Sequence, residues 1–307
     1  MSKKYSSFKS HQLITENWRR YLNEEEAPSA LQKVAVKLAD PATPLSTYVA
    51  ILKKYASDPA FRQLALAGHT DSAGPEDEQV SVKRTAIAAS KLTATQAEIG
   101  FDNSLADQMN NGAAFDGQST AIALGLKGSP IIMPSQDDPP PAILVYNGKY
   151  ILDGHHRWSQ VMMTNPTGVV AIDNMVGPAL DNEEEALKTM QLAIAGAAGK
   201  VVTKPFKGAN LMSTTPDAVA DFVLKNITDE VLQLLVQAEK LPEPSKEAAA
   251  KYYAGNLGVI KKAQGRFSRE KSMPQAGKSG TSQGAVNDLL GTGKVNFEVP
   301  AAGDVKK

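Results

Sequence analysis

The chain of 307 residues contains no cysteine. This absence excludes disulfide bonds, thiolate nucleophiles and cysteine-ligated metal sites. Aromatic residues make up only 6% of the chain and the mean hydropathy is −0.26, which indicates that part of the length lies outside any hydrophobic core. The N-terminus lacks the apolar segment of a secretory signal, and no window approaches the roughly 18 apolar residues that span a membrane. We therefore expect no membrane contact, and a protein located in the cytoplasm or in a particle assembled there.

An excess of charge of either sign is also missing, because 33 Lys and Arg residues balance 33 Asp and Glu residues. The composition therefore shows no broad basic surface for duplex nucleic acid, and DNA binding remains open only through a local patch. The four histidines do not form a His-Glu-x-x-His motif or another metal-ligand spacing, so no metal site made by the protein alone is expected.

The pattern of apolar and polar residues divides the chain into four regions. A helical N-terminal region is expected over 1–75, followed by a mixed α+β domain over 76–175. A second helical region is expected over 176–265. The remainder, 266–307, is polar and rich in Gly and Ser, which predicts an extended or disordered tail.

Several helix starts are marked by capping residues. Asp58 before Pro59 predicts a short helix, and Asp181 with Glu184 forms a capping box. Three later helices are expected to begin near Pro216, Thr228 and Ser245, the last of them ending near Lys262. Further helices are predicted by apolar spacing at 14–22, 31–38 and 45–52.

A β-hairpin is predicted in the middle of the chain. Apolar runs at 142–146 and 149–152 flank Asn147 and Gly148, a pair typical of a type I′ turn. A helix is expected directly after the hairpin, and a short buried strand over 168–173 follows it. A strand is also expected near 80–92, and a strand stub over 129–133. This succession indicates an α+β fold.

The corner between the hairpin and the next helix carries the candidate site. A helix N-terminus offers backbone N–H groups and a positive dipole to an anion. Gly154 allows close approach of a ligand, and Arg157 supplies a planar fork suited to phosphate oxygens. Asp153 would cap the helix or orient a Mg²⁺ ion. His155 and His156 point in different directions, so at most one faces the ligand. The alternative is a purely structural corner of caps and ion pairs.

The stretch "YILDGHHRW", with "KLTATQAEI" upstream, resembles the ParB/sulfiredoxin superfamily over Val80–Asn174. The resemblance implies a small α+β domain that binds nucleotide phosphates at this corner, through Asp153, Gly154, His155, His156 and Arg157. Sulfiredoxins carry Gly-Cys-His-Arg there; the histidine that replaces the cysteine excludes sulfinic-acid reductase activity. Chromosome-partition ParB proteins bind CTP and carry a helix-turn-helix, but no recognition helix follows the domain.

The Asp-Gly-His-His-Arg form matches the free-serine kinases of the same superfamily. These kinases need a carboxylate base, but Gln96 occupies its expected position and Glu98 lies two residues further on. The resemblance thus implies a phosphotransferase or nucleotide hydrolase that uses ATP, ADP or CTP with Mg²⁺, with Glu98 and His156 as catalytic residues. A non-enzymatic binding or structural protein is the alternative, and a ParB-like nuclease is a second one.

The segments "ENWRRYL", "MPQ" and "VNF" resemble proteins of tailed bacteriophages. This resemblance implies a location in the host cytoplasm or in the virion. We expect the tail to order against another surface, either on this chain or on other virion proteins. The alternation of Val295, Phe297 and Val299 suits an added edge strand. A solvated tail is the alternative.

Overall fold

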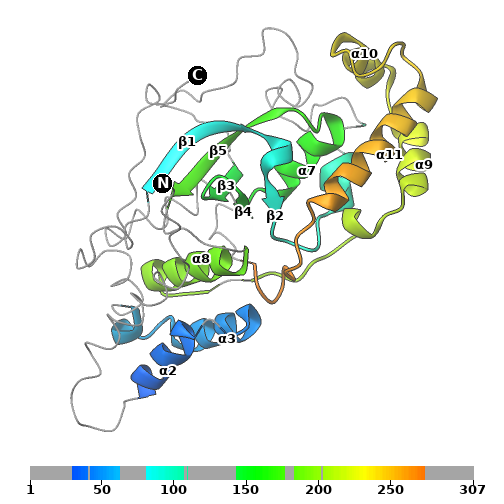
Figure 1. Cartoon of the computed structure of the whole chain (residues 1–307). Helices are drawn as coiled ribbons and strands as arrows, with labels where there is room; N and C mark the ends of the chain where they lie inside the picture. The colour runs from blue at the N-terminus through cyan, green and yellow to red at the C-terminus, as the bar shows by residue number, and fades with distance from the viewer. Residues whose placement is uncertain are drawn as a thin grey trace.

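The fold is built around a central mixed sheet, shown in Figure 1. The computed structural model describes residues 30–40, 42–62, 81–106, 109, 143–176, 183–201 and 203–273. Within these residues the sheet has five strands in the order β1-β5-β3-β4-β2. The strands are β1 (Ser81–Ala88), β2 (Thr93–Ala94), β3 (Ile143–Tyr146), β4 (Tyr150–Asp153) and β5 (Val169–Val176). Together with the helices around it, this sheet confirms the predicted α+β class.

The predicted hairpin is present between β3 and β4, which pair antiparallel. Asn147 and Gly148 both have positive φ angles, 48° and 67°, as a type I′ turn requires. The N–H of Lys149 donates to the carbonyl of Tyr146 at 3.0 Å and closes the turn. The N–H of Gly148 donates to Oδ1 of Asn174 at 2.6 Å, which ties the turn to β5.

The other three strands extend the sheet on either side of the hairpin. β5 lies parallel to β3 and antiparallel to β1, and it extends past the predicted end at 173 to Val176. The predicted strand near 80–92 corresponds to β1. The two-residue strand β2 lies parallel to β4 and leads into residues 95–100, which pass beside the candidate site. The predicted strand stub at 129–133 lies outside the described residues.

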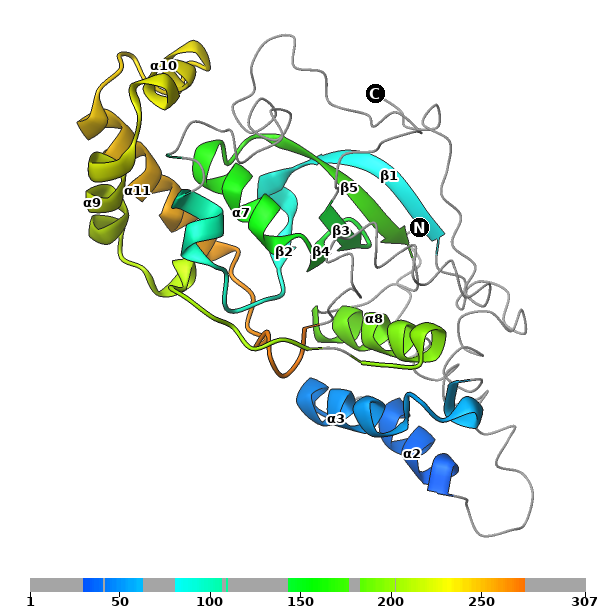
Figure 2. The ribbon, with the colours of Figure 1, turned by 180° about the vertical axis from the view of Figure 1, so that it is seen from behind.

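Helices cover both faces of the sheet, as Figure 2 shows from behind. Along β3, Ile143 and Val145 face one cluster, while Leu144 and Tyr146 face the other, as the period of a strand requires. The first face carries α7 (His155–Thr164), α9 (Pro216–Asn226), α10 (Asp229–Gln237) and α11 (Lys246–Lys262). The second face carries α8 (Glu183–Ala198), against which α3 (Leu45–Tyr55) packs, with α2 (Ala30–Ala39) next to it.

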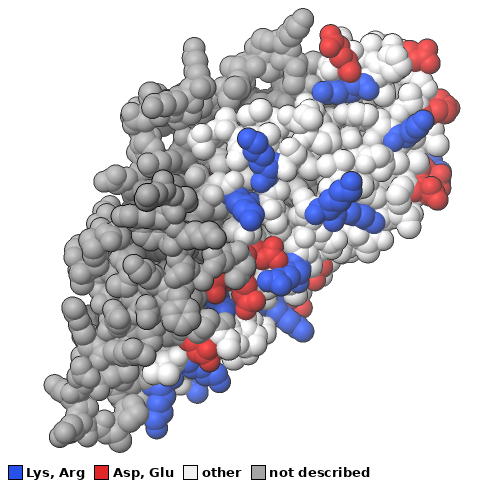
Figure 3. Space-filling view, viewed as in Figure 1, with Lys and Arg blue, Asp and Glu red and all other residues white. Residues whose placement is uncertain are grey.

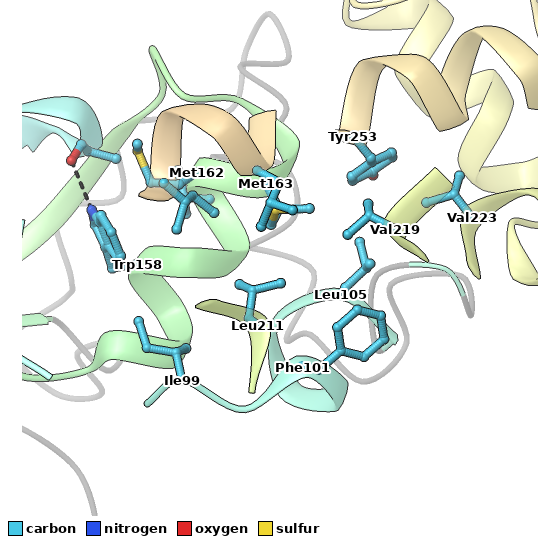
Figure 4. Close-up of a cluster of buried hydrophobic side chains, with 14 of the residues drawn as sticks. Ile99, Phe101, Leu105, Trp158, Met162, Met163, Leu211, Val219, Val223 and Tyr253 are labelled. Carbon is cyan, nitrogen blue, oxygen red and sulfur yellow. Dashed lines mark hydrogen bonds between the residues drawn. The ribbon is translucent and has the colours of Figure 1, made fainter. Parts of the chain in front are cut away.

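The first face has the larger core, drawn in Figure 4. Trp158 of α7 is fully buried, and its indole Nε1 donates to the carbonyl of Ala89 at 3.0 Å. Val219 of α9 and Tyr253 of α11 belong to the same cluster. The hydrophobic core therefore continues across the boundary expected at residues 175 and 176.

The helices begin within one residue of the predicted starts at Pro216, Thr228 and Ser245. Thr215, Thr228 and Ser245 are the N-caps of α9, α10 and α11, and each side chain accepts a hydrogen bond from a backbone N–H inside its helix. Oδ1 of Asp58 accepts from the N–H of Ala60 at 2.8 Å, which confirms that predicted helix start. The helices expected at 31–38 and 45–52 are α2 and α3. The helix expected at 14–22 lies outside the described residues.

Glu184 makes a contact that the sequence did not predict. Its predicted capping-box partner, Asp181, lies outside the described residues. Oε1 of Glu184 accepts a hydrogen bond from the N–H of Leu45 at 2.9 Å, at the start of α3. Pro44, the N-cap of α3, makes no side-chain cap hydrogen bond. A side chain of α8 therefore caps α3, a helix far away in the sequence.

The described surface is mixed in charge. On the face shown in Figure 3, Lys and Arg side chains are spread among Asp and Glu and do not gather into one patch. None of the helices in the described regions of the chain is long and apolar enough to cross a membrane.

Candidate functional site

The candidate site lies where β4 ends and α7 begins. Gly154 separates the two elements and has a left-handed backbone, with φ at 93°. A Cβ atom added there would lie 3.0 Å from Nη2 of Arg157 and 3.2 Å from Cα of Ile143. Both the backbone angle and the lack of space require glycine. The guanidinium group of Arg157 therefore lies against Gly154, at the start of α7.

His155 is buried, and its hydrogen bonds connect α7 to the segment 95–100. Its Nε2 accepts hydrogen bonds from the backbone N–H groups of Thr95 and Gln96, both at 3.2 Å. The Thr95 hydroxyl donates to the carbonyl of Ile151 at 2.6 Å. Burial, followed by the neighbouring charges of His156 and Arg269, lowers the pKa of His155 to about 3. The ring is therefore neutral, and its acceptor nitrogen is occupied by the protein.

His156, the next residue in α7, has a similar role. Its Nε2 accepts from the N–H of Gly100 at 3.1 Å. Burial, then Arg269 and Arg157, lower the pKa of His156 to about 4. The two histidines were predicted to face different ways, yet both Nε2 atoms accept from the segment 95–100. The lone pair of His156 that a catalytic base would use is engaged in this contact.

Gln96 and Glu98, the two candidates for the position of the base, lie on the same segment. Gln96 is buried, and its side-chain amide donates to the carbonyl of Glu98. Oε2 of Glu98 accepts from the backbone N–H of Arg269 at 2.9 Å. The Glu98 carboxylate is thus bound by a segment from near the other end of the chain.

That segment is the C-terminal strap, residues 263–273. It leaves α11 and runs toward α8, as the orange coil in Figure 1 shows. The N–H of Phe267 donates to the carbonyl of Thr95 at 3.0 Å, and the carbonyl of Phe267 accepts from Ala97 at 2.9 Å. Met273 at its end is fully buried. Residues 266–273 of the expected tail therefore order against this chain itself, and the expected edge strand at 295–299 lies outside the described residues.

The strap brings a second arginine to the corner. Burial raises the pKa of Asp153, whereas Arg157, the N–H of Gly154 and Arg269 lower it. Both guanidinium groups therefore act on one carboxyl group, one from α7 and one from the strap. Arg269 was not among the predicted site residues, because nothing in its polar, Gly-rich surroundings indicates where the chain folds back.

Among the buried polar atoms of this corner, Oδ2 of Asp153 and Nε of Arg269 have no hydrogen-bond partner among the described residues. One is an acceptor and the other a donor, and buried polar groups in native proteins are nearly always paired. The corner therefore has hydrogen-bonding capacity left for a bound molecule.

A metal ion bound by the protein alone is not supported by the described residues, which contain no group of three His, Asp or Glu side chains that could hold one. Mg²⁺ usually binds through one or two carboxylates together with substrate phosphates. Asp153 could supply one carboxylate to a Mg²⁺ ion that is shared with a bound phosphate.

No protein-family model, no curated protein and no solved structure matches this chain. The resemblance to the ParB/sulfiredoxin superfamily therefore stays a prediction that rests on the sequence motifs.

Proposed function

We propose that the corner formed by Asp153, Gly154 and the first turn of α7 binds a phosphate-bearing small molecule, with a nucleotide as the leading candidate. The observation that carries the proposal is the position of Arg157, whose guanidinium lies against Gly154 at the start of α7. A cation at a helix N-terminus has the same sign as the helix dipole, so this position attracts anions; Asp153 is one, and a phosphate group would be a second. A phosphate group would be bound by the arginine and by the helix N–H groups together.

Asp153 narrows the chemical class of the ligand. Its Oδ2 is buried without a partner among the described residues and can accept a hydrogen bond. A molecule that offers a hydroxyl group as well as a phosphate could donate to Asp153 and accept from Arg157. Nucleotides carry both groups, on the ribose and on the phosphates, whereas inorganic sulfate offers no donor.

The arrangement favours binding over catalysis. Both histidines use Nε2 to accept backbone hydrogen bonds, and Glu98 accepts from the C-terminal strap. The two histidines therefore offer no free Nε2 to a substrate proton, and one oxygen of the Glu98 carboxylate is already engaged. We therefore favour the non-enzymatic alternative. The phosphotransferase, hydrolase and nuclease activities, and the place in a phage virion, stay predictions from resemblance.

Calorimetric titration with ATP, ADP, CTP and inorganic phosphate, each with and without Mg²⁺, tests the proposal. Arg157→Ala should weaken binding about tenfold or more, since a charge-assisted hydrogen bond contributes roughly 1.5–3 kcal/mol. Arg157→Lys keeps the charge but not the planar fork, so an intermediate loss is expected. Lys225→Ala is the control for charge, because Lys225 is an exposed cation in the last turn of α9 and not part of the C-terminal strap. Its affinity should equal that of the wild type.

Two outcomes would contradict the proposal. One is the absence of binding by every probe at millimolar concentration. The other is equal weakening in Arg157→Ala and Lys225→Ala, which would indicate a nonspecific effect of charge. Turnover of ATP or CTP by the wild type, abolished in Glu98→Gln with binding preserved, would instead favour the enzyme.

A further inference from the structure

The C-terminal strap contributes its own charged residue to the corner, and this suggests how the site closes. Resting on the binding function proposed above, we infer that Arg269 is a second phosphate-binding residue and that the C-terminal strap clamps the bound ligand. Ligand binding and strap docking would then stabilise each other.

The first support is the placement of Arg269. Its backbone N–H is held by Oε2 of Glu98 at 2.9 Å, which fixes where the side chain starts. Its Nε is buried and has no hydrogen-bond partner in the described regions of the chain. A guanidinium N–H buried in this way is costly unless something accepts its hydrogen bond. The partner expected by chemistry is an oxygen of an anionic ligand.

The second support is the matching acceptor in the same corner. Oδ2 of Asp153 is also buried without a partner among the described residues. Arg269 is close enough to lower the pKa of Asp153, so the two side chains share one electrostatic environment. A ligand with both acceptor oxygens and a hydroxyl donor would supply a hydrogen-bond partner to Asp153 and to Arg269. The C-terminal strap and α7 would then contact the same molecule.

The third support is how the C-terminal strap is attached on both sides of Arg269. On one side, Phe267 forms a parallel bridge with Gln96. On the other, the carbonyl of Ser272 accepts from Nε2 of Gln191 in α8 at 2.8 Å, and Met273 is fully buried. Arg269 is therefore held between two anchors, and this restricts it to the corner.

The attachment is nevertheless limited in extent. The pairing with residues 94–97 consists of an isolated bridge and neighbouring backbone hydrogen bonds, not of a full strand of the sheet. Between the anchors, Glu270 and Lys271 are exposed. Local opening of such a segment costs less free energy than global unfolding. A ligand that contacts it should therefore measurably slow its opening.

The test is hydrogen exchange on the full chain, combined with calorimetry, using ATP as the probe and inorganic phosphate as a second probe. In the wild type, saturating ATP should slow exchange of the amides of Ala97, Phe267 and Arg269 at least threefold. Arg269→Ala should weaken ATP binding about tenfold and remove this protection. Lys271→Ala, an exposed cation of the same strap, is the matched control and should behave as the wild type.

The outcomes separate this inference from the proposed function. Binding that is lost in Arg157→Ala but unchanged in Arg269→Ala, with strap exchange unaffected by ATP, overturns the clamp alone. No binding of either probe by the wild type overturns both. If Arg269→Ala speeds strap exchange without ligand, the alanine variant has lost strap docking itself. Arg269→Gln then tests the role of the charge, because glutamine keeps polar contacts and removes the charge. Wild-type affinity in a glutamine variant with a docked strap would also overturn the inference.

Discussion

The Nε2 atom of His155 accepts a hydrogen bond from the backbone N–H of Thr95 at 3.2 Å. This contact joins the first turn of α7 to the segment after β2, which also pairs with the C-terminal strap. His156 repeats the contact with Gly100. The neutral imidazole rings thus hold the segment 95–100 against α7, and their protonation should weaken this contact.

The first prediction is loss of stability in mild acid. Burial lowers the pKa of His155 to about 3 and that of His156 to about 4, from 6.5 when unfolded. Below pH 6.5 the unfolded chain therefore binds protons that the folded chain does not. The contribution of these residues to stability is complete above pH 6.5 and decreases as the pH falls toward 4. The slope approaches about 1.4 kcal/mol per pH unit for each histidine.

Urea unfolding at pH 7, 6 and 5 measures this dependence. His155→Gln removes one titrating ring, so its stability should be lower at pH 7 but should change less between pH 7 and pH 5. A wild-type free energy of unfolding that stays constant from pH 7 to pH 5 would contradict the low histidine pKa values.

The second prediction concerns Gly265 in the C-terminal strap. A Cβ atom there would lie 2.1 Å from the carbonyl carbon of Thr95, so an alanine forces the strap away from its partner. Gly265→Ala should lower the free energy of unfolding by about 1–3 kcal/mol. Gly258→Ala is the control, since a Cβ at Gly258 of α11 meets nothing within 4 Å. It should raise stability by roughly 0.5–1 kcal/mol. Equal effects of the two substitutions in thermal unfolding would show that the strap does not dock as described.

The third prediction concerns the long-range cap of α3. Glu184→Ala removes the acceptor of the Leu45 N–H and the ion pair with Lys188, whose Nζ lies 3.4 Å away. We expect a loss of about 0.5–2 kcal/mol in chemical denaturation, the usual cost of losing an N-cap. Glu184→Gln keeps an acceptor oxygen and should lose less. Glu247→Ala is an exposed control, whose carboxylate accepts from Ser245 and from a backbone N–H at the start of its own helix, and it should change stability less. A glutamine variant as unstable as the alanine variant would assign the effect to charge and not to capping.

Local signals in the sequence were sufficient for much of the fold. The hairpin was predictable because Asn147 and Gly148 adopt the positive φ angles that few residues tolerate. The starts of α9, α10 and α11 were predictable because Thr215, Thr228 and Ser245 each cap a helix within three residues of themselves. In each case the donor and the acceptor are near neighbours in the chain.

The candidate site was only partly predictable. The sequence by itself determined that Gly154 and Arg157 lie at a strand-to-helix corner, because hairpin, glycine and helix follow one another without interruption. Only the tertiary structure decided that His155 faces Thr95 and that Glu98 is held by the strap. It also decided that Glu184 caps α3. These contacts join segments far apart in the chain, and they form because the packing of α8 and α11 on opposite faces of the sheet brings them together, which no local pattern of residues encodes.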